Sequence, residues 1–265
     1  ILEGLDEQFT IEGIALYDNG WGQIDLDTSS VVVRLGDQDV TEHFNFVSFP
    51  GNVSYTCEGH SVNSNGFCAT GQCNSYQPAE RYVELDEWGS EVVWYEISNA
   101  GQLYWVAEQV NVYHNGYLNV RLMDNITVNE DLTAENLRSW TPIGNLYANY
   151  CGEFDGNGFT ISGLYLSDPE MDYVGLFGYT SYYYPITDVH LTNSYFEGNS
   201  NVGGLFGNAG SSISGCSVSD TVTVKGNSNL GGIAGGSQFG ELTNSYSMAN
   251  IIPGEEGYDR GGLVG

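Results

Sequence analysis

The chain has 265 residues and a formal net charge of −28, from 34 acidic and 6 basic residues. This charge repels nucleic acid and anionic membrane surfaces and attracts cations, so we expect no nucleic-acid partner. No stretch approaches the roughly 20 apolar residues that a membrane-spanning helix needs. The hydrophobic content of 41%, with 36 glycines and 19 tyrosines, favours a folded all-β protein rich in turns.

Residues 1–56 are predicted to form a small β-sandwich-like module. Extended apolar runs at Val31–Leu35 and Phe44–Phe46 indicate short strands, and Asp18-Asn19-Gly20 indicates a turn. Residues 57–91 are predicted to form a compact knuckle followed by a linker, because cysteines and a histidine crowd into its first part.

The predicted knuckle contains four residues of the types that bind zinc: Cys57, His60, Cys68 and Cys73. Three cysteines and one histidine at this approximate spacing are typical of a structural zinc site, in which four protein ligands leave no open coordination position. The four-residue gap before Cys73 is longer than the usual two. A disulfide among the three cysteines is therefore the alternative in an oxidising environment.

Residues 92–265 are predicted to form a parallel β-helix with a helical cap at its N-terminal side. A helix begins after Asn99, whose side chain is expected to cap it, with Gln102 completing a capping box. Its apolar face holds Leu103, Val106, Ala107 and Val110. We expect residues 97–150 to cover the open apolar end of the first coil. A second short helical element is predicted near residues 132–137.

A glycine-cornered tetrapeptide sets the period of the β-helix. It recurs at steps of 29, 28 and 30 residues, as Gly175-Leu176-Phe177-Gly178, Gly204-Leu205-Phe206-Gly207, Gly232-Ile233-Ala234-Gly235 and Gly262-Leu263-Val264-Gly265. Such a period indicates stacked units that bury their apolar faces against one another. Leucine-rich repeats and propeller blades fit less well, since their signature and their length are absent. Parallel connections predict a right-handed coil, and the glycines are expected to permit sharp corners.

Aligning the last three units predicts which side chains stack. Each unit offers about three short strands separated by Gly, Asn and Ser turns. The expected columns are Ile186, Ile213 and Leu242; Val189, Cys216 and Ser245; Leu191, Val218 and Ser247; and Phe196, Val222 with Val224, and Ile251 or Ile252.

These repeats resemble GLUG-repeat proteins, which are bacterial surface or secreted proteins that include regions of immunoglobulin A proteases and large adhesins. The resemblance rests on the tetrapeptides and on the segments Phe154–Leu164, Trp140–Gly144 and Ile97–Leu103. It covers roughly residues 95–265 and implies a scaffold rather than a reaction. The segment Asp39–Gly51 looks like the end of an MBG-type β-module of bacterial surface proteins.

No catalytic motif is recognisable in the sequence. There is no zinc-peptidase His-Glu-x-x-His, no nucleophile elbow and no phosphate-binding loop with Lys, so we expect no organic cofactor. Calcium is the other candidate metal, since carboxylates cluster near two turns, but the regular Asp-x-Asp-x-Asp-Gly loop is missing and solvated turns are the favoured account. The two clusters are Asp18, Asp25 and Asp27, and Glu255, Glu256 and Asp259. Asp155 is interpreted as a turn residue.

Exposed tyrosines are the candidate ligand-binding residues. Tyr182, Tyr183 and Tyr184 are consecutive, and tyrosine faces on a solenoid wall can bind sugar rings or a host protein. The alternative is that these rings cover a flank of the coil.

We therefore expect a non-enzymatic extracellular protein of a bacterial surface, acting as a rigid scaffold, adhesin or assembly subunit. A carbohydrate-binding or polysaccharide-degrading β-helix protein is the alternative. Lyases of acidic polymers need basic residues, and only Lys225 and Arg260 follow residue 138. The chain begins at Ile1 rather than Met, as a trimmed secreted protein would. Because it stops at Gly265 on a corner motif, we expect a longer protein or a homo-oligomer that stacks into filaments.

Overall fold

The computed structural model describes residues 61–69, 75–238 and 241–265, with only the backbone of 255–258, and the backbone of seven short strands within residues 9–55. It divides into two compact units. The first comprises Ile1–Ser61 and Cys68–Ser75, and the second Val62–Phe67 and Tyr76–Gly265. Each unit is described by itself.

The first unit contains short antiparallel strands, as its apolar runs predict. β4 (Val32–Leu35) lies between β1 (Phe9–Glu12) and β5 (Gln38–Asp39). Two further pairs are β2 (Ala15–Asp18) with β3 (Ile24–Asp27), and β6 (Phe44–Phe46) with β7 (Val53–Tyr55). The predicted turn at Asp18-Asn19-Gly20 lies in the connection of the β2–β3 pair, whose residues 19–23 are outside the described ones. The sandwich arrangement and the MBG-type likeness stay predictions.

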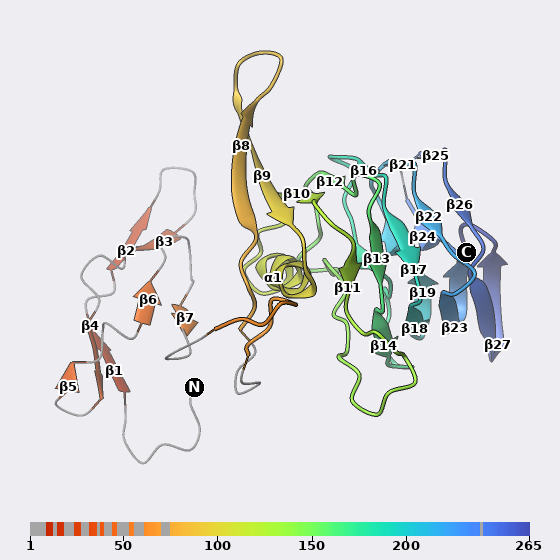
Figure 1. The fold of residues 1–265 in the computed structure, drawn as a ribbon, viewed down its shortest axis with the longest axis horizontal. Helices are drawn as coiled ribbons and strands as arrows, with labels where there is room; N and C mark the ends of the chain where they lie inside the picture. The colour runs from red at the N-terminus through yellow and green to blue at the C-terminus, as the bar shows by residue number, and fades with distance from the viewer. Residues whose placement is uncertain are drawn as a thin grey trace. The chain divides into compact units, whose positions relative to one another are not determined.

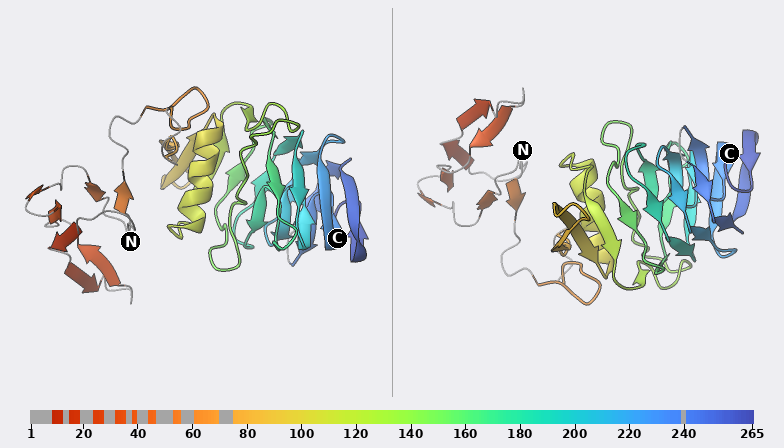
Figure 2. Two further views of the ribbon diagram at one scale, coloured as in Figure 1. Left: turned by 90° about the horizontal axis from the view of Figure 1, so that it is seen from below. Right: turned by 90° about the horizontal axis from the view of Figure 1, so that it is seen from above.

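The second unit is a β-solenoid whose four parallel sheets run side by side along the stack (Figures 1 and 2). The first sheet holds, in order, β25 (Leu242–Thr243), β21 (Ile213–Ser214), β16 (Ile186–Thr187), β12 (Phe154–Asp155), β10 (Asn119–Leu122), β9 (Glu91–Ile97) and β8 (Glu80–Leu85). The second holds β11 (Ile126–Thr127), β13 (Thr160–Ser162), β17 (His190–Thr192), β22 (Ser217–Val218) and β26 (Tyr246–Ser247).

The third and fourth sheets complete each coil. The third holds β14 (Tyr165–Ser167), β18 (Tyr195–Glu197), β23 (Thr223–Gly231) and β19 (Ser200–Gly203), with β27 (Asn250–Gly261) also paired to β23. The fourth holds β15 (Phe177–Tyr179), β20 (Phe206–Ala209) and β24 (Ala234–Ser237). The predicted parallel β-helix is thereby confirmed, while its right-handed sense stays a prediction.

Three of the four columns predicted to stack pair in register in adjacent coils, and a further column pairs in the fourth sheet. These columns are Ile186, Ile213 and Leu242; Leu191, Val218 and Ser247; Phe196, Val224 and Ile251; and Phe177, Phe206 and Ala234. Cys216 is fully buried, and burial raises the pKa of its thiol to about 11. The in-register columns form the interior of the coil.

Aromatic rings fill the interior of the earlier coils. The rings of Phe177 and Phe206 stack with centroids 5.2 Å apart, and Phe154 meets Phe177 edge-on at 5.1 Å. Ile143 forms a parallel bridge with Phe177. The Trp140–Gly144 segment therefore occupies, one coil earlier, the place of the glycine-cornered tetrapeptide.

Two details differ from the prediction. A coil contributes more than three strands, because the second half of each of the first three tetrapeptides continues as a strand of the fourth sheet instead of ending at a corner. The tetrapeptide glycines are also not needed for positive φ. A Cβ on Gly204 would lie 2.6 Å from the Gly232 carbonyl oxygen and 2.9 Å from Val218 Cγ1, so close approach of the next coil excludes a side chain there.

The sharp corners belong instead to asparagine and aspartate. One corner repeats a left-handed residue in four successive coils, at Tyr173, Asn201, Asn229 and Asp259. Asn and Asp tolerate this backbone conformation better than other residues with side chains. The Asn229 amide also donates to the Asn201 side-chain oxygen at 3.1 Å, and Asn227 donates to Asn199 in the same way. Two successive coils are thus joined at this corner by hydrogen bonds between asparagines.

Helix α1 (Ala100–Asn111) packs against this core, at the β9–β10 end of the solenoid (Figure 1). Asn99 caps it as predicted, since its side chain accepts from the Gln102 N–H at 3.0 Å. The Gln102 side chain bonds back to the Ser98 N–H at 2.7 Å, one residue before the expected capping-box partner. The predicted apolar face is buried, and Leu103, Val106 and Val110 have no exposed surface.

The predicted second helix near residues 132–137 does not form. This segment is a series of turns and bends. The Asp131 carboxylate accepts from both the N–H and the hydroxyl of Thr133, so the chain makes a local side-chain turn where a helix would need backbone bonds.

The β8–β9 hairpin projects beyond the neighbouring strands of the first sheet (Figure 1). β8 falls within residues 57–91, the range expected to hold the knuckle and linker, and it pairs antiparallel with β9. Nearby, Phe67 and Tyr76 form a bridge, and the Arg138 guanidinium lies 3.6 Å from the Phe67 ring centroid. The Gly101 N–H donates to the Asn65 carbonyl at 2.7 Å, which attaches this segment to the start of α1.

Replacing the tetrapeptide glycine should destabilise the solenoid. We expect Gly204→Ala to lower the free energy of unfolding by about 1–3 kcal/mol, because the new methyl overlaps the next coil. Urea titration followed by far-UV circular dichroism measures the change. Ser212→Ala, at an exposed site in the same coil, serves as the control and should shift stability by less than about 0.5 kcal/mol. Equal effects of the two changes would contradict the close-approach explanation.

A half-buried carboxylate on α1 should make stability depend on pH. Burial raises the pKa of Glu108 above its ordinary value of 4.5, so the ionised form is disfavoured in the folded state. This group's stabilising contribution is present below pH 4 and is lost as the pH rises through the folded-state pKa. We therefore expect Glu108→Gln to be more stable than the parent at pH 7 and equal to it near pH 3.5.

The control for this pH series is Glu87→Gln, which removes the same charge from the exposed turn of the β8–β9 hairpin. Chemical denaturation at several pH values gives the stability difference for each variant. A Glu108→Gln effect that is independent of pH would show that packing, and not ionisation, decides the stability at this position.

Candidate functional site

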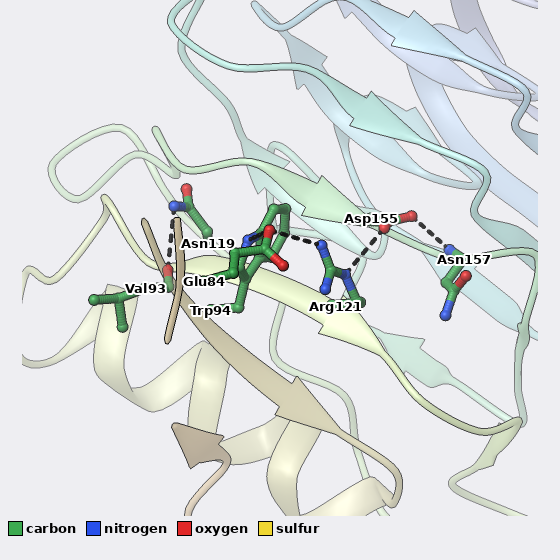
Figure 3. Close-up of polar contacts among 7 residues, drawn as sticks. All are labelled: Glu84, Val93, Trp94, Asn119, Arg121, Asp155 and Asn157. Atoms are coloured by element: carbon green, nitrogen blue, oxygen red, sulfur yellow. Dashed lines mark hydrogen bonds and ion pairs between the residues drawn. The ribbon is translucent and has the colours of Figure 1, made fainter. Parts of the chain in front are cut away.

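A polar cluster joins four neighbouring strands of the first sheet (Figure 3). We call it the Arg121 cluster, and its members are Glu84 on β8, Trp94 on β9, Arg121 on β10 and Asp155 on β12. The alternation along β10 explains its position. Val120 and Leu122 are fully buried in the core, so the intervening Arg121 lies on the outer face.

Arg121 holds the cluster together through three contacts. Its Nη2 lies 3.4 Å from Glu84 Oε1, and its Nε lies 3.3 Å from Asp155 Oδ2. The guanidinium also lies 4.2 Å from the Trp94 ring centroid, a cation–π distance. The Trp94 indole N–H donates to Glu84 Oε1 at 2.7 Å. These contacts link the antiparallel hairpin to the parallel strands of the coil.

Asp155 plays two parts in this arrangement. Its Oδ1 accepts from the Asn157 N–H at 2.8 Å, which confirms the predicted turn role, while its Oδ2 faces Arg121 (Figure 3). The pKa of the neighbouring Glu153 is raised, first by burial and then by repulsion from Asp155, with Arg121 acting in the opposite direction. The carboxylates of Glu84 and Asp155 both contact Arg121. Glu84 also accepts from the Trp94 indole, and Asp155 from the Asn157 backbone amide. This arrangement clamps neighbouring strands together.

A second charged group lies on the third sheet. The Lys225 ammonium lies 2.7 Å from Glu197 Oε1, and the Ser167 hydroxyl donates to Glu197 Oε2 at 2.5 Å. These hydrogen bonds, that from Lys225 first, lower the pKa of Glu197. Tyr165 and Tyr195 stack beside them with centroids 5.6 Å apart. Because Ser167, Glu197 and Lys225 come from β14, β18 and β23, this group ties three successive coils together.

The predicted ligand-binding tyrosines lie exposed in the loop between β15 and β16. Tyr182 and Tyr183 stack with centroids 4.6 Å apart and an interplanar angle of 25°, and Tyr117 lies 6.0 Å from Tyr183. The side chains of these three residues form what we call the tyrosine platform. Tyr184 follows in the chain and is also exposed. Sequence reasoning found the consecutive tyrosines and missed Tyr117, which comes from the turn between α1 and β10.

Most of the predicted metal residues cannot be placed. Cys57, His60 and Cys73 lie outside the described residues, as do the side chains of Asp18, Asp25, Asp27, Glu255 and Glu256. Cys68 is buried, and its N–H donates to the Ser75 carbonyl at 3.3 Å. Within the parts of the chain whose side chains are described, no three His, Cys, Asp or Glu residues are grouped to hold a metal ion. Zinc, a disulfide and calcium stay predictions.

The comparisons with known proteins agree with the repeat architecture. Residues 198–223 match the Glug family, described as the GLUG motif, so the expected resemblance is confirmed for this segment. The segment runs from the end of β18, through one glycine-cornered tetrapeptide, to the start of β23. No curated protein and no solved structure matches the chain. Among the described residues, no helix is both long and apolar enough to cross a membrane.

Removing the Arg121 guanidinium should weaken the attachment of the β8–β9 hairpin to the parallel strands of the coil. We expect Arg121→Ala to lower the free energy of unfolding by about 1–3 kcal/mol, because two carboxylates and an indole lose their partner. Arg121→Lys should recover only part of this loss, since an ammonium lacks the planar fork. Urea unfolding measured by circular dichroism reports both variants.

Arg81→Ala is the matched control, since it removes the same charge from an exposed position on β8. It should change stability by less than about 0.5 kcal/mol. If Arg81→Ala cost as much as Arg121→Ala, the effect would come from net charge and not from the clamp.

Proposed function

We propose that this protein is a non-enzymatic extracellular scaffold, a rigid repeat module of a bacterial surface. One observation carries the proposal: equivalent residues pair in register through successive coils in all four sheets. Each coil is then fixed by its neighbours along the whole circumference. A solenoid of this kind holds its length and presents its outer face at constant spacing. The GLUG motif at residues 198–223 supports a surface role.

The helical segment fits a capping role in such a scaffold. α1 buries its apolar face in the same core that the coils share, and the β8–β9 hairpin pairs with the parallel strands through β10. A cap keeps the first coil from exposing apolar side chains and unpaired strand edges. The Arg121 cluster ties this cap to β12 across the outer face of the sheet.

Association between copies is the second part of the proposal. Within the described strands, β25, β26 and β27 pair on one side only, and Met248 and Leu263 nearby are exposed. A second copy, or a further coil, would add there by parallel pairing, which is the route to a homo-oligomer or filament. Size-exclusion chromatography with light scattering over a range of concentrations tests this. A mass that stays monomeric at every concentration would remove the case for self-association.

Surface location is tested on intact cells of the native source. We expect mild protease treatment to remove this protein while a cytoplasmic marker survives, and antibodies against the folded chain to label unpermeabilised cells. Labelling that requires permeabilisation would contradict the extracellular proposal. The same cells carrying a deletion of the gene provide the control for antibody specificity.

A polysaccharide-degrading enzyme is the competing function. The purified chain, incubated with neutral and uronic polymers, should release no reducing ends and no unsaturated products. Turnover that disappears in Asp155→Asn or Glu197→Gln, while circular dichroism shows an unchanged fold, would establish an enzyme and overturn the scaffold proposal. Asp155 lies on the first sheet and Glu197 on the third, so each residue is tested by itself.

A further inference from the structure

The tyrosine platform is an exposed aromatic surface on a rigid base. Tyr117, Tyr182 and Tyr183 are 63%, 64% and 53% exposed, although they pack ring against ring. Elsewhere the chain buries tyrosine completely, as at Tyr150. Exposed aromatic area lowers the gain from folding. Exposed apolar side chains that gather in one place, unlike those scattered singly, are a feature of interaction sites.

Buried hydrogen bonds hold the platform in place from below. The Ser181 N–H donates to the Tyr150 carbonyl at 2.8 Å, and the Ser211 hydroxyl donates to the Ser181 carbonyl at 2.7 Å. On the other side, the Cys151 N–H donates to the Gly116 carbonyl at 2.7 Å, one residue before Tyr117. The residues that flank the exposed rings are therefore fixed. A surface held in one conformation loses little entropy when it binds a ligand.

The chemistry of the platform selects its occupant. Its rings offer flat π faces and phenolic hydroxyls, and a hydrogen bond with Tyr182 raises the pKa of the Tyr183 hydroxyl. A pyranose ring presents axial C–H groups on its face and hydroxyls at its edge, which match a π face and a phenol. The net charge of −28 disfavours anionic polymers.

We propose that Tyr117, Tyr182 and Tyr183 bind the sugar rings of a neutral polysaccharide, with the rings stacked on the aromatic faces. The inference rests on the proposed scaffold role, because the solenoid fixes two distant chain segments beside each other to build the platform. The proposal gives this scaffold a ligand class, the neutral polysaccharides. Uronic and sulfated polymers are disfavoured as ligands by the same charge argument.

Affinity electrophoresis of the full chain tests this inference. Native gels contain hydroxyethylcellulose, galactomannan or starch as neutral probes, and alginate or polygalacturonate as anionic probes. We expect at least one neutral polymer to retard the chain and neither anionic polymer to do so. The double change Tyr182→Ala with Tyr183→Ala should weaken retardation at least tenfold. Tyr183→Phe, which keeps the ring, should lose less than threefold.

Tyr246→Ala is the matched control, since Tyr246 is 56% exposed on the second sheet, away from the platform residues in the fold. It should bind as the parent does. Failure of every neutral polymer to retard the chain, equal retardation by anionic polymers, or unchanged binding by the double variant would each overturn the inference. Circular dichroism and thermal unfolding of each variant show that the solenoid is intact, so such a failure leaves the scaffold proposal standing.

Discussion

Close contact between the backbones of adjacent coils is the constraint on which the rest of this structure depends. At Gly204, the carbonyl of Gly232 and the side chain of Val218 occupy the space that any Cβ would need. Between these two coils the fourth sheet pairs in register, with Phe206 opposite Ala234. The sequence keeps a glycine at the equivalent position of every tetrapeptide.

Other interactions cover the strand edges that stacking leaves open and connect neighbouring strands on the outer face. Parallel coils would end in open strand edges, and the β8–β9 hairpin replaces one such edge with an antiparallel pair. The Arg121 cluster crosses four strands at this point, where the repeats have not yet begun. Farther along, Lys225 and Glu197 connect coils on the third sheet. The chain has only 6 basic residues, and two of them, Arg121 and Lys225, form ion pairs between neighbouring strands of the solenoid.

The sequence predicted the repeat region well because its apolar residues recur at one period. Aligning Ile186 with Ile213 was enough to obtain the true register. The Arg121 cluster was missed because its members come from segments that share no period. One signal was present, since alignment of Val120 with Phe154 places Arg121 beside Asp155. Tyr117 was not predicted as a platform residue for the same reason, because its neighbour Tyr183 lies in a loop outside the repeated columns. The glycine explanation failed because crowding between coils depends on distances that a sequence does not contain.

The asparagine corners have an evolutionary consequence. Asn199 and Asn201 bond to Asn227 and Asn229, so both pairs join residues of one coil to their counterparts 28 positions later. A genetic duplication of one such stretch would present each of these asparagines with a partner of the same type. The number of coils could then grow by unequal recombination with these two bonds kept, so the length of the module could vary while its cross-section stays the same.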